Sequence, residues 1–470
     1  MSGTQLLQLL PKVDRLLEDE TVRELIRHHP RSVVVDAVRQ ELEGERSRLL
    51  AGSATTVPDT STLAGNVVAR VEAAAFPGIR RCVNGAGIIL HTALGRAPLA
   101  EAAQHALADA VRSYCTLQVN LETGKRGDRY AHVEKLLQRI TGAEAALVVN
   151  NNAAATMLIL NTLAQGKEVV ISRGELVEIG GSFRIPDVMA RSGAVLVEVG
   201  TTNRTHLKDY RGALTQQTAV ILKVHQSNYR IEGFTSQVSI AELVQLGREQ
   251  KVLVVDDVGS GALVDLSRWG LPKEPLVADS VAAGADVVCF SGDKLIGGPQ
   301  CGIIVGKRAV VDRLKANQLV RALRCDKLTF AVLEATLRLF LDEDWLLRHH
   351  PVMKMLTMPE REIRSRCNRI KRSLAGIVRG GDTIRVVRDT SEVGSGSLAA
   401  VQLPTWVVAI AVGGMSADRL AAGLRKIPTP VFGRVKDDLF LLDGRTIRDD
   451  EIKLVAEGMK QAISDAGQQG

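Results

Sequence analysis

A lysine stands where a buried strand is expected to end. Residues 286–290 form an apolar run, and Ser291, Gly292, Asp293 and Lys294 follow it directly. An amine at the end of such a strand is partly desolvated, so its pKa falls and it can attack an aldehyde. The Ser-x-x-Lys order also places a hydroxyl one helical turn from the amine, where it could bind a phosphate. The alternative is an ordinary loop lysine, since β-lactamases share the four-residue pattern, although their S-D-N and K-T-G elements are absent here.

Two acids close a second expected strand. Residues 254–261 read VVDDVGSG, so the strand ends in Asp256 and Asp257 and a glycine-rich turn. A carboxylate in this place could pair with the protonated pyridine nitrogen of pyridoxal phosphate (PLP), and we favour Asp257 for this role. A helix-capping or turn aspartate is the alternative.

A third segment has the pattern of a phosphate site. Residues 148–155 read VVNNNAAA, a strand that runs into a helix start made of small residues. The unpaired amides and the positive end of such a helix bind phosphate. The segment lacks the Gly-Lys-Ser/Thr of a P-loop. Two Gly-x-Gly pairs elsewhere are not completed to G-x-G-x-x-G, because Leu90 and Val264 occupy the last position, so the sequence does not support a nucleotide-binding motif.

Three arginines could bind an oxyanion. Arg96 follows a short apolar stretch, and Arg321 and Arg324 are spaced three apart, which predicts that they share one helix face. Guanidinium groups bind oxyanions through two parallel hydrogen bonds. A solvated basic helix face is the alternative for the second pair.

The elements that would position these residues alternate between strand and helix. Ala-rich amphipathic segments such as 153–164 and 240–249 separate most of the apolar runs. This alternation predicts an α/β fold with a mostly parallel sheet covered by helices on both faces, with one antiparallel strand among the last two runs. The runs are residues 146–149, 168–172, 195–199, 219–224, 252–256, 286–290 and 302–305.

The order of the motifs also matches a known fold. A phosphate-binding helix start, a strand-end aspartate and a later strand-end lysine occur in this order in PLP enzymes of fold type I, the aspartate aminotransferase-like fold. We expect three regions: a small helical N-terminal domain and linker at 1–62, a large PLP-binding α/β domain at 63–330, and a small C-terminal α+β domain at 331–470. A long helical stretch is expected at 330–348, with strands at 406–412 and 439–443.

The composition of the chain bears on its partners and its compartment. The chain has 470 residues and a formal net charge of +7, which suits a polyanionic partner but also ordinary solubility. Six basic residues at 361–372 indicate a solvated helix face or one that faces RNA. The six cysteines are scattered without zinc-ligand spacing, and no signal peptide or membrane-spanning run is evident. We therefore expect a cytoplasmic protein with no bound metal.

Over nearly its whole length the sequence resembles the bacterial selenocysteine synthases. The matching segments include HTALGRA at 91–97, VNNNAAA at 149–155, SRGELVEIGGSFRIPDV at 172–188, KVHQSNYRIEGF at 223–234, LPKEP at 271–275 and FSGDKLIGG at 290–298. The resemblance implies a PLP enzyme that converts seryl-tRNA(Sec) to selenocysteinyl-tRNA(Sec) with selenophosphate. It also implies an N-terminal module that holds the tRNA and a homodecamer built as a ring of five dimers.

The resemblance implies roles for the cofactor-binding residues. Lys294 matches the lysine that forms the Schiff base with PLP, and Asp257 matches the partner of the pyridine nitrogen. The phosphate-binding segment corresponds to Asn151, Asn152 and Ala153, together with Ser291.

The resemblance also implies roles for the reacting groups. Asp293 is a candidate acid for the departing hydroxyl. The family's selenophosphate-binding arginines correspond to Arg96, Arg321 and Arg324. One position departs from the family, because Ala93 stands where asparagine is usual, which puts a hydrogen bond near Arg96 in doubt. The alternative activity is that of a PLP lyase or transferase acting on a small free amino acid, which would need no tRNA-binding module.

Overall fold

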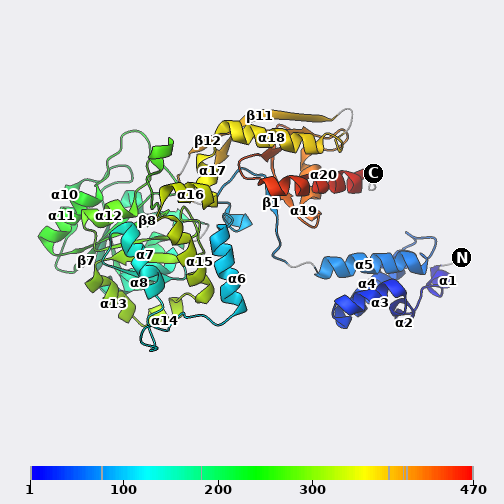
Figure 1. Cartoon of the computed structure of the whole chain (residues 1–470), viewed down its shortest axis with the longest axis horizontal. Coiled ribbons are helices and arrows are strands. Elements are labelled where there is room, and N and C mark those ends of the chain that lie inside the picture. Colours follow the sequence, from blue (N-terminus) through cyan, green and yellow to red (C-terminus); the bar gives the residue numbers. More distant parts are fainter. Residues whose placement is uncertain are drawn as a thin grey trace. The chain divides into compact units, whose positions relative to one another are not determined.

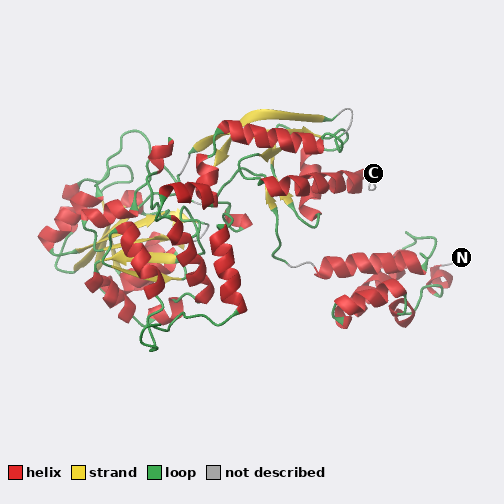
Figure 2. Ribbon diagram, in the orientation of Figure 1, coloured by secondary structure: helices red, strands yellow, loops and turns green. Residues whose placement is uncertain are grey.

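The chain divides near residue 81 into two compact units, Met1–Arg81 and Cys82–Gly470, in the computed structural model. The structure describes residues 3–75, 78–180, 183–378, 382–394, 396–398 and 401–467. Figures 1 and 2 show the elements of both units. The first unit extends beyond residue 62, because the helix that starts at Thr60 supplies part of its core.

The first unit is a small helical bundle. Pro30 separates α3 from α4, as its missing N–H and fixed φ predict. Leu16, Val34, Leu63 and Val67 are among the side chains of its core. The helices are α1 (Gly3–Leu7), α2 (Val13–Leu17), α3 (Glu20–His28), α4 (Arg31–Leu50) and α5 (Thr60–Ala75).

A seven-stranded sheet forms the centre of the second unit, in the order β2-β10-β9-β8-β7-β3-β6. The expected antiparallel strand is β10, which runs opposite to both β2 and β9, while the other neighbours are parallel. The prediction of a mostly parallel sheet is therefore confirmed. The strands are β2 (Ala145–Val149), β3 (Glu168–Ser172), β6 (Val195–Val199), β7 (Thr218–Val224), β8 (Leu253–Gly259), β9 (Val287–Ser291) and β10 (Gly302–Gly306).

Helices cover this sheet on both faces. The helix α8 packs with α9 and α13, whereas α12 packs with α7 and α11. Every residue of β2, β9 and β10 is buried, as strands between two helical layers require. The helices are α6 (Glu101–Arg112), α7 (Ala131–Thr141), α8 (Asn152–Ala164), α9 (Ile185–Ser192), α10 (Leu207–Ala213), α11 (Ile240–Gln250), α12 (Val277–Ala283), α13 (Arg308–Ala316), α14 (Leu319–Leu323) and α15 (Lys327–Leu339).

The C-terminal part adds a second, four-stranded sheet in the order β11-β12-β15-β14, with every pair antiparallel. A separate short pairing joins β1 (Val83–Asn84) to β13 (Val431–Phe432), so the start of the second unit is anchored near its end. The remaining elements are α16 (Glu343–His349), α17 (Pro351–Thr357), α18 (Glu360–Leu374), β11 (Thr383–Glu392), β12 (Gln402–Ala411), α19 (Ala417–Lys426), β14 (Arg434–Lys436), β15 (Leu439–Asp443) and α20 (Ile452–Gly467), while β4 (Glu178–Ile179) and β5 (Phe183–Arg184) form a small hairpin.

Two local expectations differ from the structure. The helical stretch expected at 330–348 is two helices, because Asp342 caps the start of α16 by accepting a hydrogen bond from Trp345 N at 2.7 Å. The strand β11 was not expected, since its alternation of half-buried and exposed residues gives a weak apolar signal. Among the described residues, no helix is long and apolar enough to cross a membrane.

Candidate functional site

A cavity of 580 Å³ opens where the carboxyl ends of the parallel strands meet, and for the role proposed for it below we call it the catalytic cavity. This edge of an open α/β sheet is the usual place for a ligand site. The cavity brings together most of the residues singled out in the sequence. Those that line it are Arg96, Asn151, Asn152, Ala153, Asp257, Ser291, Asp293 and Lys294.

Lys294 lies in a turn directly after β9 and is 6% exposed. Burial lowers the pKa of its amine, while the nearby carboxylates of Asp257 and Asp293 act in the opposite direction. The turn is held by the next residue, since Leu295 N donates to Ser260 O at 3.3 Å. A buried lysine with a lowered pKa is suited to react with a carbonyl group.

The side chains of the two neighbouring aspartates of β8 lie on opposite faces of the strand. Asp257 lines the catalytic cavity, whereas Asp256 lines a different cavity and accepts a hydrogen bond from Ser280 Oγ at 2.6 Å. This separation follows from the alternation of side chains along a strand. Asp257 is therefore the acid that can meet a bound cofactor.

Asp257 is held by the start of α8. Asn152 Nδ2 donates to its Oδ1 at 2.8 Å, and Thr156 Oγ1 donates to its Oδ2 at 3.0 Å. Burial is the largest influence on its pKa, which is raised, and these hydrogen bonds oppose the rise. A cationic N–H facing this carboxylate would compensate for its burial.

The first turn of α8 faces the same cavity. Asn151 caps the helix, because its side chain accepts a hydrogen bond from Ala154 N at 2.8 Å. The strand β10 begins very close by, and a Cβ on Gly302 would lie 2.1 Å from Asn151 O, so only glycine fits there. The helix start therefore presents its first amides to the cavity from a fixed position.

Arg96 and Asp293 form an ion pair beside the lysine. Arg96 Nε donates to Asp293 Oδ2 at 3.2 Å, and its Nη1 donates to Thr92 Oγ1 at 2.9 Å. The two side chains are 26% and 14% exposed, so both remain accessible from the cavity. The pair places an oxyanion-binding group and a carboxyl group next to Lys294.

Arg321 and Arg324 are not among the residues that line this cavity, and both are exposed. The prediction that they share a helix face is wrong, because α14 ends at Leu323 and Arg324 is extended, with φ −69° and ψ 143°. The chain leaves the helix to pair with the end of β2, where Asn150 N donates to Leu323 O at 2.9 Å and Val149 bridges Arg324.

The residues fit PLP. The cavity offers an amine for its aldehyde, a carboxylate for its ring nitrogen and a helix start for its phosphate. Asn152 lines the cavity, and its Oδ1 is buried without a hydrogen-bond partner among the described residues, so this acceptor is available to a bound group. Residues that follow or end β2, β8 and β9 would thus hold the phosphate, the ring nitrogen and the aldehyde of one PLP molecule.

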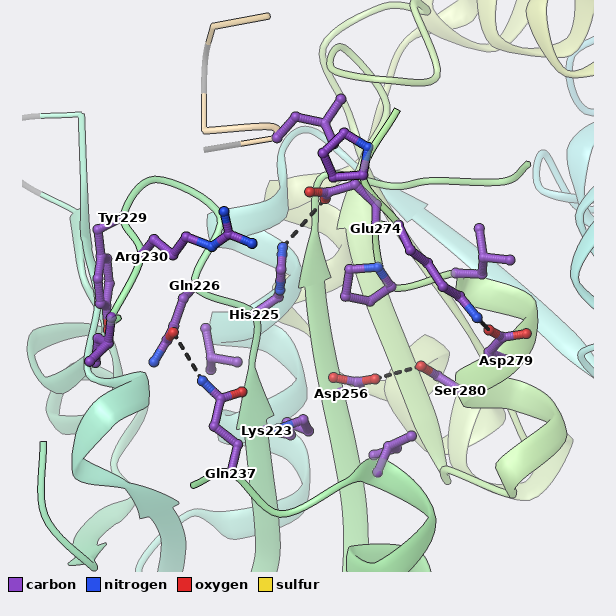
Figure 3. Close-up of a pocket in the computed structure, with 18 of the residues that line it drawn as sticks. Lys223, His225, Gln226, Tyr229, Arg230, Gln237, Asp256, Glu274, Asp279 and Ser280 are labelled. Atoms are coloured by element: carbon purple, nitrogen blue, oxygen red, sulfur yellow. Dashed lines mark hydrogen bonds and ion pairs between the residues drawn. The ribbon is translucent and has the colours of Figure 1, made fainter. Parts of the chain in front are cut away.

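No role was predicted for His225, which follows β7 and lines the catalytic cavity. Its Nε2 lies 3.4 Å from Glu274 Oε2, and Ser260 Oγ donates to the same carboxylate oxygen at 2.9 Å. Figure 3 shows the pair in the wall of a second cavity of 460 Å³, which also borders on Val224. Its place directly after a buried strand was the feature of the sequence that could have indicated a site residue.

Two family models and several known proteins match this sequence, and the proteins match it over nearly its full length. The family model described as "L-seryl-tRNA selenium transferase" matches residues 82–448, and the one described as "Selenocysteine synthase N terminal" matches residues 7–46. The L-seryl-tRNA(Sec) selenium transferase of Geobacter sulfurreducens is 50% identical over 456 residues, covering 97% of this chain and 99% of that protein. The one from Alkaliphilus oremlandii is 46% identical over 467 residues, covering 98% and 100%.

A solved structure shares the fold. D-Glucosaminate-6-phosphate ammonia-lyase superposes with a TM-score of 0.56 at 20% identity, covering 83% of this chain and 97% of that one. The expected fold class, type I of the PLP-dependent enzymes, is confirmed by the sheet order and this superposition. The length and identity of the sequence matches decide the family: the chain belongs to the L-seryl-tRNA selenium transferases.

Proposed function

We propose that this protein converts seryl-tRNA(Sec) to selenocysteinyl-tRNA(Sec) with selenophosphate, as a PLP-dependent transferase. The observation that carries the proposal is one cavity that joins Lys294, Asp257, the start of α8 and the Arg96–Asp293 pair in a chain of this family. PLP, when bound, supplies an electron sink that stabilises negative charge at Cα of the serine.

The protein's own residues would guide the protons. Asp257 would hold the ring nitrogen in its cationic form, because a buried carboxylate favours a positive partner. Lys294, with its lowered pKa, would accept the proton from Cα. Asp293 would relay this proton from Lys294 to the serine hydroxyl, which leaves as water when the Cβ–O bond breaks.

Selenium would then enter at the same carbon. Arg96 would bind the selenophosphate oxyanion at the cavity wall and direct its selenium toward Cβ. The Cβ–Se bond forms as a proton returns to Cα, and water cleaves the P–Se bond to release phosphate. Arg321 and Arg324 are proposed to assist from outside this chain's own cavity. The PLP phosphate is assigned to Asn151, Asn152, Ala153 and Ser291.

The tRNA would be held partly by the N-terminal unit. The match of residues 7–46 to the N-terminal family model supports this assignment. The tRNA-binding module would then be the whole first unit, residues 1–81, followed by a large PLP-binding domain and a small domain after residue 330. We further propose a homodecamer in the cytoplasm, with the mass from light scattering as the test of assembly.

The decisive experiment incubates the PLP-loaded protein with seryl-tRNA(Sec) and selenophosphate and then identifies the aminoacyl group. We expect selenocysteine on the tRNA, and none when selenophosphate is omitted or when Lys294→Ala replaces the wild type. A parallel reaction with free L-serine tests the alternative of a small-substrate enzyme, which these relatives do not favour. Conversion of free serine without conversion of seryl-tRNA would overturn the proposal.

A further inference from the structure

A groove of 600 Å³ borders the catalytic cavity, and we call it the α16 groove. The two share one wall: Arg96, Ala97 and Leu99 line the catalytic cavity, while Pro98, Leu99 and Ala100 line the groove. Its other walls come from α6, α16, α17 and the chain near Arg448. Figure 1 shows α16 and α17 where the α/β part meets the C-terminal part. A ligand in the groove would therefore lie next to the reacting groups.

The α16 groove carries an exposed aromatic stack. The rings of Trp345 and His349 are stacked with centroids 3.9 Å apart, and Trp345 is 49% exposed. The stack is held in place, because His349 Nδ1 lies at hydrogen-bond distance from Trp345 O, 2.9 Å. A fixed indole at the surface is the kind of platform on which a nucleobase stacks.

The groove also carries cations without acidic partners. Five basic side chains line it against two acidic ones, Glu101 and Asp449. Arg366 pairs with Asp449 at 2.8 Å and Arg448 with Glu451 at 2.9 Å. Arg348 and Lys354 are exposed and form no ion pair with the described carboxylates. Arg348 lies 5.9 Å from the Trp345 ring centroid, so a positive charge lies beside the aromatic platform.

The second cavity, which also adjoins the catalytic cavity, lacks this excess of positively charged residues. This cavity is drawn in Figure 3. Three basic residues line it, Lys223, Arg230 and Lys273, and three acidic residues balance their charge. Lys273 Nζ lies 3.7 Å from Asp279 Oδ2, and Lys223 Nζ lies 2.8 Å from Glu175 Oε1, so both lysines are paired. Charge therefore favours the α16 groove as the site for an anionic chain.

We propose that the α16 groove binds the single-stranded 3′ end of the aminoacylated tRNA. A base would stack on Trp345, and the adjoining phosphodiesters would lie against Arg348 and Lys354. The serine is esterified to the terminal ribose, so the last nucleotides must lie beside the cavity that holds Lys294. The inference rests on the proposed function and adds the place where the substrate RNA enters.

The test compares Trp345→Ala and Lys354→Ala with Lys273→Ala, a lysine in the balanced neighbouring cavity. We expect Trp345→Ala to raise KM for seryl-tRNA about tenfold, with kcat and KM for selenophosphate nearly unchanged. Lys354→Ala should raise KM for seryl-tRNA and reduce its dependence on salt, because one phosphate contact is lost. Lys273→Ala should behave as wild type.

A second measurement uses a short single-stranded RNA ending in CCA as the probe. It should quench the tryptophan fluorescence of the PLP-loaded wild type but not that of Trp345→Ala. If the wild type converts seryl-tRNA and both groove variants keep its KM, the inference fails while the proposed function stands. A changed oligomer mass with unchanged KM would show that a second copy of the chain covers the groove, which also overturns the inference.

Discussion

At the scale of single residues, the two aspartates of β8 show how one position in a strand decides a role. Asp256 and Asp257 are both buried, yet only Asp257 lines the catalytic cavity. Burial raises the pKa of Asp256 to about 6, and Ser280 supplies its hydrogen bond on the other side. Because Asp256 and Asp257 have the same side chain, substitution of each gives a matched pair of variants that differ only in which cavity is changed.

We predict that Asp257→Asn lowers kcat about 100-fold or more, because the fixed negative charge facing the ring nitrogen is lost. Asp256→Asn should keep near-wild-type activity, since it changes a side chain outside the catalytic cavity. Steady-state kinetics and the visible spectrum of bound PLP measure both. Equal losses in the two variants would contradict the assignment of Asp257.

At the scale of elements, the turn that carries Lys294 rests on the start of α17. His350 caps this helix, and its Nε2 donates to Ile296 O at 2.6 Å while its Nδ1 accepts from Met353 N at 3.2 Å. Gly297 lies against the same ring with φ +61°, and a Cβ there would be 2.6 Å from His350 Cε1. The position of Lys294 therefore depends on a helix that begins more than fifty residues later in the chain.

We expect Gly297→Ala to destabilise this turn by about 1–3 kcal/mol, through the positive φ and the clash with His350. The variant should show a lower Tm and retain less PLP after dialysis. Gly212→Ala is the control, because it lies in α10 with no atom within 4 Å of the added Cβ. Full PLP retention at wild-type Tm in Gly297→Ala would contradict this account.

Acid should weaken the same contact. Burial lowers the pKa of His350 to about 4 from 6.5, so the folded protein keeps the ring neutral while the unfolded chain binds a proton below pH 6.5. The stabilisation is complete above pH 6.5 and is lost as pH falls toward 4, by about 3 kcal/mol. Tm measured across this range should fall more steeply for the wild type than for His350→Gln, and parallel curves would refute the prediction.

At the scale of the whole molecule, the arginines do not all lie at one chain's cavity. Arg96 lines it, whereas Arg321 and Arg324 are exposed and lie outside its lining. Active sites of fold type I enzymes commonly form between two subunits, so a second copy could bring Arg321 to the cavity.

Co-expression of Lys294→Ala with Arg321→Ala tests whether Arg321 acts between subunits. A mixed dimer then contains one site with both residues intact, so we predict recovered selenium transfer at up to about half of the sites in each mixed dimer. Each variant expressed alone should be severely impaired. If mixed dimers form but show no recovered selenium transfer, Arg321 does not act on the site of the other subunit.

The sequence by itself determined the local features of this protein. The apolar runs predicted the strands β3 and β6 at their observed bounds. Asn151 caps the helix that follows β2, as its motif predicted, and Asp257 lies two residues before the end of β8. Strand and helix periodicity depends on neighbours in the chain, so it is legible without a structure. The order of the three motifs was enough to predict a PLP fold.

Only the tertiary structure decided which side chains meet. The pleat of β8 separates Asp257 from Asp256, and the pairing of β2 with the chain after α14 turns Arg324 out of a helix. His225 reaches the cavity from the end of β7, although no role was predicted for it. The α16 groove likewise joins residues near 99 to residues near 345. These contacts depend on register and on packing between distant segments, and local spacing carries no information about either.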